Sequence, residues 1–214
     1  MSWTNATRPA HIRPVTADDP DADVVLDSLV HLHATCILND HTMATFIPPL
    51  SFERMRERWR TFLSEAKAGK RVILVCVSAI DERREAPHDV RAPFDAKELP
   101  SLASGEEVAG TVSLSMPESE TGPFRGLVQN LFVSPYHRRK GIAAALLDEL
   151  EHQALQHDRW NLMLDTTQGS AAEALYVRLG WEKLGVVKDY GLDPRDGQLL
   201  DEVFFWKDIR SREE

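Results

Sequence analysis

A basic turn stands between an apolar run and a helical pattern, and it has the composition of an anion-binding site. The turn reads Arg138-Arg139-Lys140-Gly141, after the apolar residues 127–133 and before the helical pattern that starts at Ile142. The first turn of a helix offers unpaired backbone N–H groups and a partial positive charge, and glycine lets a phosphate come close to the backbone. The sequence therefore predicts a strand, a turn and a helix N-terminus that bind a pyrophosphate group.

The spacing within this turn narrows the kind of ligand. The turn lacks the Gly-x-Gly-x-x-Gly pattern of dinucleotide sites and the Gly-x-x-x-x-Gly-Lys-Ser/Thr pattern of magnesium-nucleotide sites. It reads Arg-x-x-Gly-x-Ala, with Arg138, Gly141 and Ala143 at the fixed positions. This pattern resembles the acetyl-CoA-binding signature of the GNAT superfamily of N-acetyltransferases.

A second block, after the predicted helix, extends the resemblance. Residues 161–167 and 171–181, which contain Leu175-Tyr176 and Leu179-Gly180-Trp181, are similar to the closing strand and the Leu-Tyr-x-x-Leu-Gly-aromatic helix of the superfamily. With two earlier strand-like segments, the resemblance covers roughly residues 11–208. Within the superfamily the chain looks most like the tabtoxin-resistance type, which acetylates a small amino-acid-like molecule.

The resemblance implies a set of contacts with acetyl-CoA. Backbone N–H groups of the turn and helix would hold the pyrophosphate, and main-chain groups of the preceding strand would pair with the pantetheine amides. The basic side chains of the turn could add contacts or form a solvated basic turn. The expected cofactor-binding residues are Leu131, Phe132, Val133, Arg138, Arg139, Lys140, Gly141, Ile142, Ala143 and Ala144.

Tyr176 is the candidate general acid. Acetyl transfer from a thioester to an amine needs a neutral amine and a proton for the departing thiolate. A phenol, with an ordinary pKa of about 10, can donate that proton, and Tyr176 matches the superfamily's tyrosine. The alternative is a tyrosine that only packs in the core. Where the superfamily often has an asparagine before this helix, the chain has Gly169-Ser170, and Ser170 could cap the helix instead.

The sequence does not single out the base that takes a proton from the amine. Asp165 and Glu118 are the acidic candidates by position, although each could be a cap or a solvated charge. Gln129 could orient a water molecule but cannot accept a proton. These three residues are the candidates for contact with substrate. The eight histidines show no ligand spacing, so no metal is expected.

Composition predicts one soluble, cytoplasmic domain. A chain of 214 residues, 43% of them hydrophobic, can bury a single sizeable core. A formal charge of −9 disfavours nucleic-acid binding and suits a cationic acceptor. No apolar stretch reaches the ~20 residues of a membrane helix, so no membrane partner is expected, and the N-terminus lacks a signal-peptide pattern. Cys36 and Cys76 are expected to be buried, reduced thiols.

Hydrophobic periodicity predicts an α/β fold: a single GNAT-like domain whose mixed sheet, with parallel and antiparallel strands, is flanked by helices. Residues 1–10 are an expected flexible tail, and residues 11–208 form the domain. Residues 79–107 are charged, rich in proline and too long for a hairpin loop, so we expect a disordered insertion or a lid. The expected helices are 23–38, 51–63, 142–157 and one within 171–181, and the expected strands are 12–15, 72–78, 108–116, 127–133, 161–167, 182–189 and 202–207.

Two details of these elements can be tested against a structure. Ser51 is the expected N-cap of the second helix, and Asp148, Glu151 and His152 form the expected exposed face of the main helix. The last two strands carry adjacent aromatic residues, which permits a homodimer.

These observations favour an acetyl-CoA-dependent N-acetyltransferase that acts on a primary amine of a small molecule, such as an amino acid or a toxin-like analogue. Two alternatives stay open. A protein acetyltransferase for lysine or N-terminal amines would need an open groove near residues 39–50. An acyl-CoA-binding module without turnover is compatible with the replaced asparagine and the unassigned base.

Overall fold

The predicted elements are present in the computed structural model, which describes residues 10–40, 45–80, 101–102 and 105–210. The strands are β1 (His11–Pro14), β2 (Arg71–Ala79), β3 (Glu106–Ser115), β4 (Arg125–Val133), β5 (Asn161–Thr167), β6 (Glu182–Leu192) and β7 (Leu199–Asp208). The helices are α1 (Ala22–Asn39), α2 (Phe52–Lys67), α3 (Ile142–Gln156), α4 (Ala171–Arg178) and the short 3-10 turn η1 (Pro135–His137).

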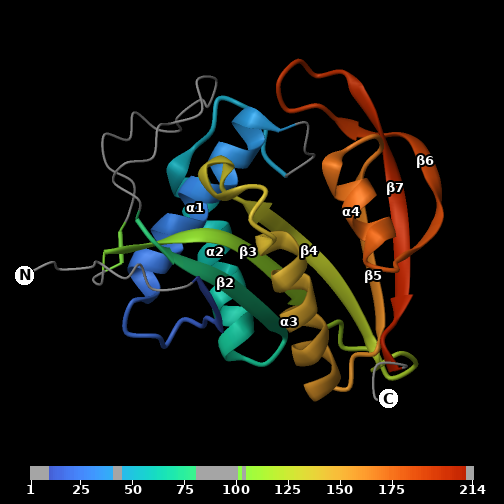
Figure 1. Cartoon of the computed structure of the whole chain (residues 1–214), viewed down its shortest axis with the longest axis horizontal. Coiled ribbons are helices and arrows are strands. Elements are labelled where there is room, and N and C mark those ends of the chain that lie inside the picture. Colours follow the sequence, from blue (N-terminus) through green and yellow to red (C-terminus); the bar gives the residue numbers. More distant parts are fainter. Residues whose placement is uncertain (1–9, 41–44, 81–100, 103–104, 211–214) are drawn as a thin grey trace, which may run out of the picture.

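The strands form one mixed sheet in the order β1-β2-β3-β4-β5-β7-β6. All neighbouring pairs are antiparallel except β4 and β5, which are parallel. The parallel pairing covers only Arg125–Leu127 against Asn161–Met163, and the two strands then separate (Figure 1). This confirms the predicted α/β fold, and it leaves an opening in the middle of the sheet.

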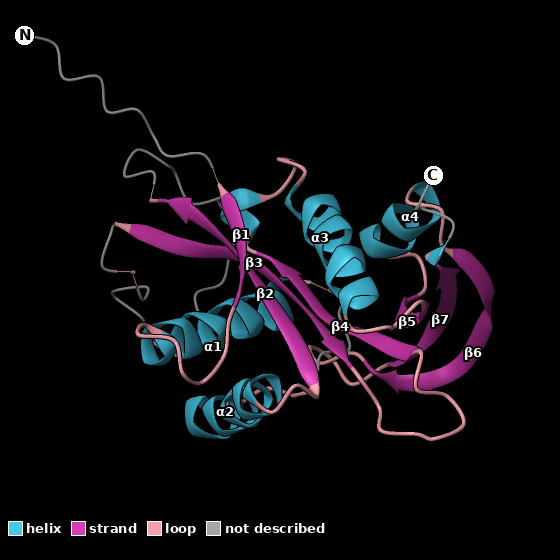
Figure 2. Ribbon diagram, turned by 90° about the horizontal axis from the view of Figure 1, so that it is seen from below, coloured by secondary structure: helices cyan, strands magenta, loops and turns pink. Residues whose placement is uncertain are grey.

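Helices cover both faces of this sheet. Figure 2 shows α1 and α2 on one face and α3 and α4 on the other. Two of the helices bury residues of the apolar stripes that the sequence predicts: Met55 and Trp59 of α2 are almost fully buried, as are Leu146 and Leu150 of α3. Burial of such side chains contributes about 1.5–3 kcal/mol each, which is how the helices are held on the sheet.

The helix starts follow from local sequence. Ser51 caps α2, because its hydroxyl accepts a hydrogen bond from the Arg54 backbone N–H at 3.3 Å. Ser170 caps α4 in the same way, with the Glu173 N–H at 3.2 Å. Both caps confirm the sequence predictions. α2 runs four residues past its predicted end, to Lys67, because its last turn has good helix formers and stops only before Gly69, whose φ is 72°.

The prediction that Glu151 lies on the exposed face of α3 is wrong. Its side chain is only 3% exposed and pairs with Lys207 of β7 at 2.8 Å. The partner lies 56 residues away in the sequence, so helical periodicity alone could not indicate it. Asp148 and His152 of the same predicted face are not among the buried residues.

The ends of the predicted 79–107 insertion belong to the sheet. β2 continues through Ala79 and β3 begins at Glu106, because their antiparallel pairing extends to the Ala79–Glu106 pair. Leu102 is also buried, at 6% exposure, and forms a β-bridge with Glu106. The body of the insertion, residues 81–100 and 103–104, lies outside the described residues, as does the predicted tail except Ala10.

Two further predictions concern the chain as a whole. Cys36 and Cys76 are buried free thiols, as expected. Within the described part of the chain, none of the helices is both long and apolar enough to cross a membrane.

Candidate active site

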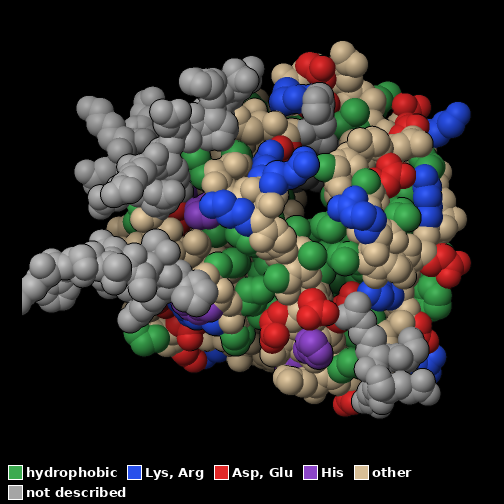
Figure 3. All heavy atoms as spheres, in the orientation of Figure 1, with side chains coloured by type: hydrophobic (Ala, Val, Ile, Leu, Met, Phe, Trp, Pro, Cys, Tyr) green, Lys and Arg blue, Asp and Glu red, His purple; other side chains and the backbone are tan. Residues whose placement is uncertain are grey.

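A cleft of about 1050 Å³ opens where β4 and β5 separate. It is lined from both faces of the sheet: by the N-terminal turn of α3 and by α4 on one face, and by the C-terminal end of α1 and Arg58 in the middle of α2 on the other. In the space-filling view, lysine and arginine side chains gather around a hollow between α3 and α4 (Figure 3). The arginines that line the cleft include Arg138, Arg139 and Arg178.

The turn before α3 presents backbone N–H groups to this cleft. Arg139 and Gly141 both have left-handed backbone, with φ of 63° and 80°, and a turn that mixes right- and left-handed residues forms an anion-binding concavity. α3 has no side-chain cap, and its first backbone bond runs from the Ala145 N–H to the Gly141 carbonyl. The N–H groups of residues 142–144 therefore have no acceptor within the helix.

The space above Gly141 is open. A Cβ built on this glycine would meet no atom within 4 Å. The turn thus combines a free helix N-terminus with an unfilled approach to the backbone, and these residues fit the pyrophosphate of acetyl-CoA.

A buried hydrogen-bonded pair and an ion pair fix the turn, and sequence reasoning missed both. His137 and Glu107 are buried and lie 2.7 Å apart, which ties η1 to β3. The Arg138 guanidinium pairs with Asp40 at 2.6 Å and donates to the Val133 carbonyl at 3.3 Å. Arg138 is therefore already partnered within the protein, so its side chain adds less to phosphate binding than its position in the signature implies.

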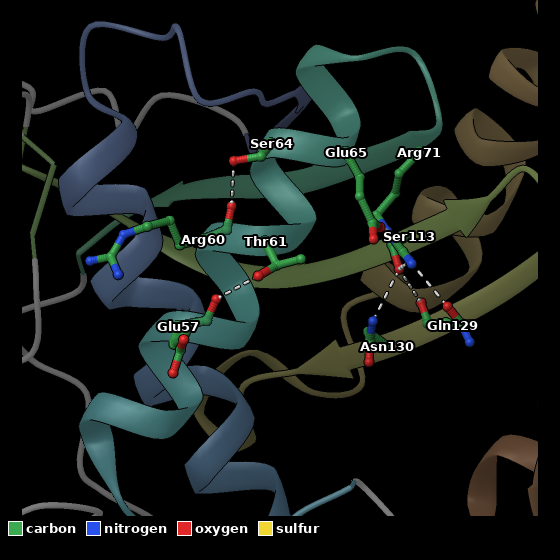
Figure 4. Close-up of polar contacts among 9 residues, drawn as sticks. All are labelled: Glu57, Arg60, Thr61, Ser64, Glu65, Arg71, Ser113, Gln129 and Asn130. Carbon is green, nitrogen blue, oxygen red and sulfur yellow. Dashed lines mark hydrogen bonds and ion pairs between the residues drawn. The ribbon is translucent and has the colours of Figure 1, made fainter.

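β4 is bent at Asn130, which also lines the cleft. Asn130 has φ of 56°, and the β3–β4 register shifts beside it, as in a β-bulge. Figure 4 shows the polar network beneath: Asn130 donates to Ser113 at 3.1 Å, and the Arg71 guanidinium donates to Gln129 at 3.0 Å and to Ser113 at 3.2 Å. An asparagine within an apolar strand run was the available signal, because asparagine tolerates this conformation.

Beyond the bulge, β4 has a strand edge that could pair with the pantetheine arm of acetyl-CoA. Leu131, Phe132 and Val133 of β4 line the cleft on the side where β5 has moved away. A strand edge without a neighbouring strand offers its N–H and C=O groups to an extended ligand. The residues expected to pair with the pantetheine amides are therefore suitably placed.

Tyr176 lies in the cleft wall with its ring packed in the core. The residue is 4% exposed, and its ring centroid lies 5.6 Å from Phe205 and 6.1 Å from Trp181. Burial raises the pKa of the Tyr176 phenol above its ordinary value, and the charges of Asp165 and Glu202 raise it further. The phenol therefore stays protonated at neutral pH and is available as a proton donor.

Asp165 and Glu202 line the cleft beside Tyr176. The pKa of Asp165 is raised, chiefly by loss of hydration. Burial, the charge of Asp165 and a hydrogen bond with it raise the pKa of Glu202 to about 8. Sequence reasoning did not propose Glu202, although an acid that begins the apolar alternation of the last strand was a visible signal.

The structure brings most of the predicted site residues together. Tyr176, Gln129 and Asp165 line the cleft, as do all the predicted cofactor residues except Lys140. Glu118 does not line it: its side chain is 75% exposed and pairs with Lys70 at 3.1 Å. Within the described residues, no group of three or more histidine, cysteine, aspartate and glutamate side chains could hold a metal ion.

The split sheet, the open helix N-terminus and the buried tyrosine define an acyltransferase with a pyrophosphate-bearing donor. Comparison with known families agrees, because residues 53–181 match the model of the acetyltransferase (GNAT) family. The chain belongs to this family and is an acetyl-CoA-dependent N-acetyltransferase.

Solved structures of other proteins share this fold. A phosphinothricin acetyltransferase from Sinorhizobium meliloti in complex with AcCoA is 23% identical, with a TM-score of 0.62 and coverage of 93% of this chain and 88% of that one. A ribosomal-protein-alanine N-acetyltransferase from Brucella melitensis is 22% identical, with a TM-score of 0.62 and coverage of 92% and 99%. At these identities the likeness shows the fold and not the acceptor.

Proposed function

We propose that this enzyme transfers the acetyl group of acetyl-CoA to the primary amine of a small, amino-acid-like molecule in the cytoplasm. The observation that carries the proposal is that the turn at Gly141, the Tyr176 side chain and the Asp165 side chain line one and the same cleft. The sequence resemblance to the tabtoxin-resistance type supports a small acceptor, and the two unpaired thiols suit a reducing compartment.

The side chains supply both proton transfers of the reaction. An alkylammonium with a pKa of about 10 must lose a proton before its nitrogen can attack the thioester. Asp165, open to the cleft, accepts this proton, and the buried Tyr176 hydroxyl donates one to the departing thiolate. The extended edge of β4 and the turn at Gly141 would hold the donor still, which lowers the entropic part of the barrier.

The position of Arg58 bears on whether the acceptor has a second functional group besides its amine. Its guanidinium lines the cleft on the α2 side and contacts the Phe62 ring at 4.8 Å, while Arg71 contacts the same ring at 4.0 Å. Loss of hydration and the nearby Arg71 charge lower the pKa of Arg58, and Arg58 forms no ion pair with any described residue. A guanidinium that lines a cleft and has no ion-pair partner among the described residues favours an anionic ligand. We therefore propose that the acceptor has a carboxylate as well as an amine.

Replacing Arg58 by glutamine should raise KM about tenfold for amino acids, since a charge-assisted hydrogen bond contributes about 1.5 kcal/mol. The KM for matched amines without a carboxylate should stay the same. Arg60→Gln is the control, because Arg60 is exposed on the same helix and does not line the cleft. Steady-state rates with both acceptor series decide the matter. If KM changes equally in the two series, or in neither, Arg58 does not bind the acceptor. Faster acetylation of peptides than of small amines would favour the protein-acetyltransferase alternative.

We also propose that two copies of the chain associate through β6. This edge strand is exposed along nearly its whole length and carries the exposed apolar residues Leu184, Val186, Val187 and Tyr190. An unpaired strand edge with apolar side chains favours a second strand or a partner surface. Light scattering should give the mass of a dimer, and Val187→Lys should give that of a monomer. A wild-type mass of one chain would contradict this proposal.

A further inference from the structure

Asp165 and Glu202 are brought together by the pairing of β5 and β7. Asp165 lies opposite Phe204, and Thr167 lies opposite Glu202. Because side chains alternate along a strand, the two acids lie on the same face of the sheet at diagonal positions. Leu164 and Val203, on the other face, belong to the core cluster that packs with α3.

The two carboxyl groups differ in access to solvent. Asp165 is exposed to the cleft, whereas Glu202 is 4% exposed and its Oε2 atom has no hydrogen-bond partner. The Thr167 hydroxyl, on the neighbouring strand position, is also buried without a partner. Neither acid forms an ion pair with a lysine, arginine or histidine of the described residues. A buried, incompletely paired carboxyl group that lines a catalytic cleft calls for a chemical reason.

Electrostatics gives such a pair one favoured state near neutral pH. Two carboxylates at close range in a partly dehydrated site cannot both ionise easily, so they titrate together and one proton is retained. Within the described part of the chain, no cationic side chain pairs with either acid to relieve the repulsion. The retained proton resides mainly on the buried Glu202, since burial disfavours its charged form.

We propose that Asp165 and Glu202 share one proton in the resting enzyme and act together as the general base, with Asp165 meeting the amine and Glu202 acting through Asp165. This inference rests on the proposed function of the cleft. Glu202 is a positioning residue in this scheme, because Asp165 is exposed to the cleft whereas Glu202 is buried.

The protons balance over one catalytic cycle. The acceptor ammonium gives one proton to the pair, which already holds one proton and carries a single negative charge, and Asp165 passes a proton to solvent after the turnover. The neutral nitrogen then forms a bond to the acetyl carbon, and the carbon–sulfur bond breaks. Tyr176 donates its proton to the thiolate and recovers one from the attacking nitrogen. The products are an amide, the free thiol and one proton in solution.

The sign of the pH dependence follows from this scheme. Loss of the shared proton makes the pair a stronger base, so kcat/KM should rise as pH increases through about 8, where Glu202 ionises. The phenol of Tyr176 on α4 interacts with both acids. The other ionisable side chains that line the same cleft are Cys36, Asp40, Arg58, His137, Arg138, Arg139 and Arg178. The β6 residue opposite Glu202 is the uncharged Val187. Deprotonation of the free acceptor amine would add a second rise in the pH profile of kcat/KM near the amine's pKa of about 10, and this rise would not depend on Glu202.

Two measurements on the full chain test the inference. Carbon-13 NMR of labelled carboxyl groups, without acetyl-CoA, should show one group that titrates near 8 in the wild type and is absent in Glu202→Gln. The pH profile of kcat/KM in Glu202→Gln should lose the limb near 8, with a plateau about tenfold lower because Asp165 alone is a weaker base. Glu182→Gln, an exposed change on β6, should match the wild type in both measurements.

The outcomes separate this inference from the proposed function. A wild-type Glu202 that titrates near 4 to 5, or a limb that stays in folded Glu202→Gln, overturns the shared base but leaves the acetyltransferase intact. An NMR titration near 8 without acetylation of any amine overturns the proposed function and with it the role of the pair in catalysis.

Discussion

Replacing Tyr176 by phenylalanine should lower kcat by about 10²–10⁴-fold, the usual contribution of a positioned general acid. The change keeps the ring that packs against Phe205 and Trp181 and removes only the hydroxyl. The melting temperature and the affinity for acetyl-CoA should therefore stay close to the wild type. The raised pKa of the phenol keeps it protonated below pH 10, so the loss should be nearly constant from pH 6 to 9.

Single-turnover acetyl transfer is the measurement, because product release can hide a change in chemistry. Tyr190→Phe is the control, since Tyr190 is exposed on β6 and does not line the cleft. An unchanged single-turnover rate in folded Tyr176→Phe would reduce Tyr176 to a packing residue.

Replacing Gly141 by valine should weaken acetyl-CoA binding by at least ~2 kcal/mol, about 30-fold in Kd, the scale of one or two charge-assisted hydrogen bonds. The new side chain would occupy the open space above the turn and block the N–H groups of α3. It would also strain a backbone with φ of 80°, so stability must be controlled separately.

Gly69→Val provides that control. Gly69 has φ of 72° and equally open surroundings, but it lies between α2 and β2, away from the cleft. Both variants should lose similar stability, and only Gly141→Val should lose affinity in calorimetry. Equal affinities would place the pyrophosphate elsewhere.

The local features of this protein could be read from the sequence. The caps at Ser51 and Ser170, the apolar stripes of the helices and the basic turn at Gly141 depend on neighbouring residues, so a short window contains the information. Family resemblance placed Tyr176 in the cleft, and the order of the elements followed from periodicity.

The features that were missed are contacts between distant residues. The residues of the pairs Glu151–Lys207 and Glu107–His137 are 56 and 30 positions apart in the sequence. Glu202 joins the site only because β7 pairs with β5. Glu118, by contrast, was a candidate because of its position in the sequence after β3, but it does not line the cleft. Which residues share a face across two strands depends on the sheet register, and no single segment encodes that.

Thiol release tests most directly whether this cleft transfers acetyl groups to small amines. Wild-type enzyme with acetyl-CoA should release free thiol only when an acceptor amine is added, fastest with amino acids, and should form one acetylated product per thiol. Binding of acetyl-CoA without amine-dependent thiol release from any small amine or peptide would contradict the claim and make the protein an acyl-CoA-binding module.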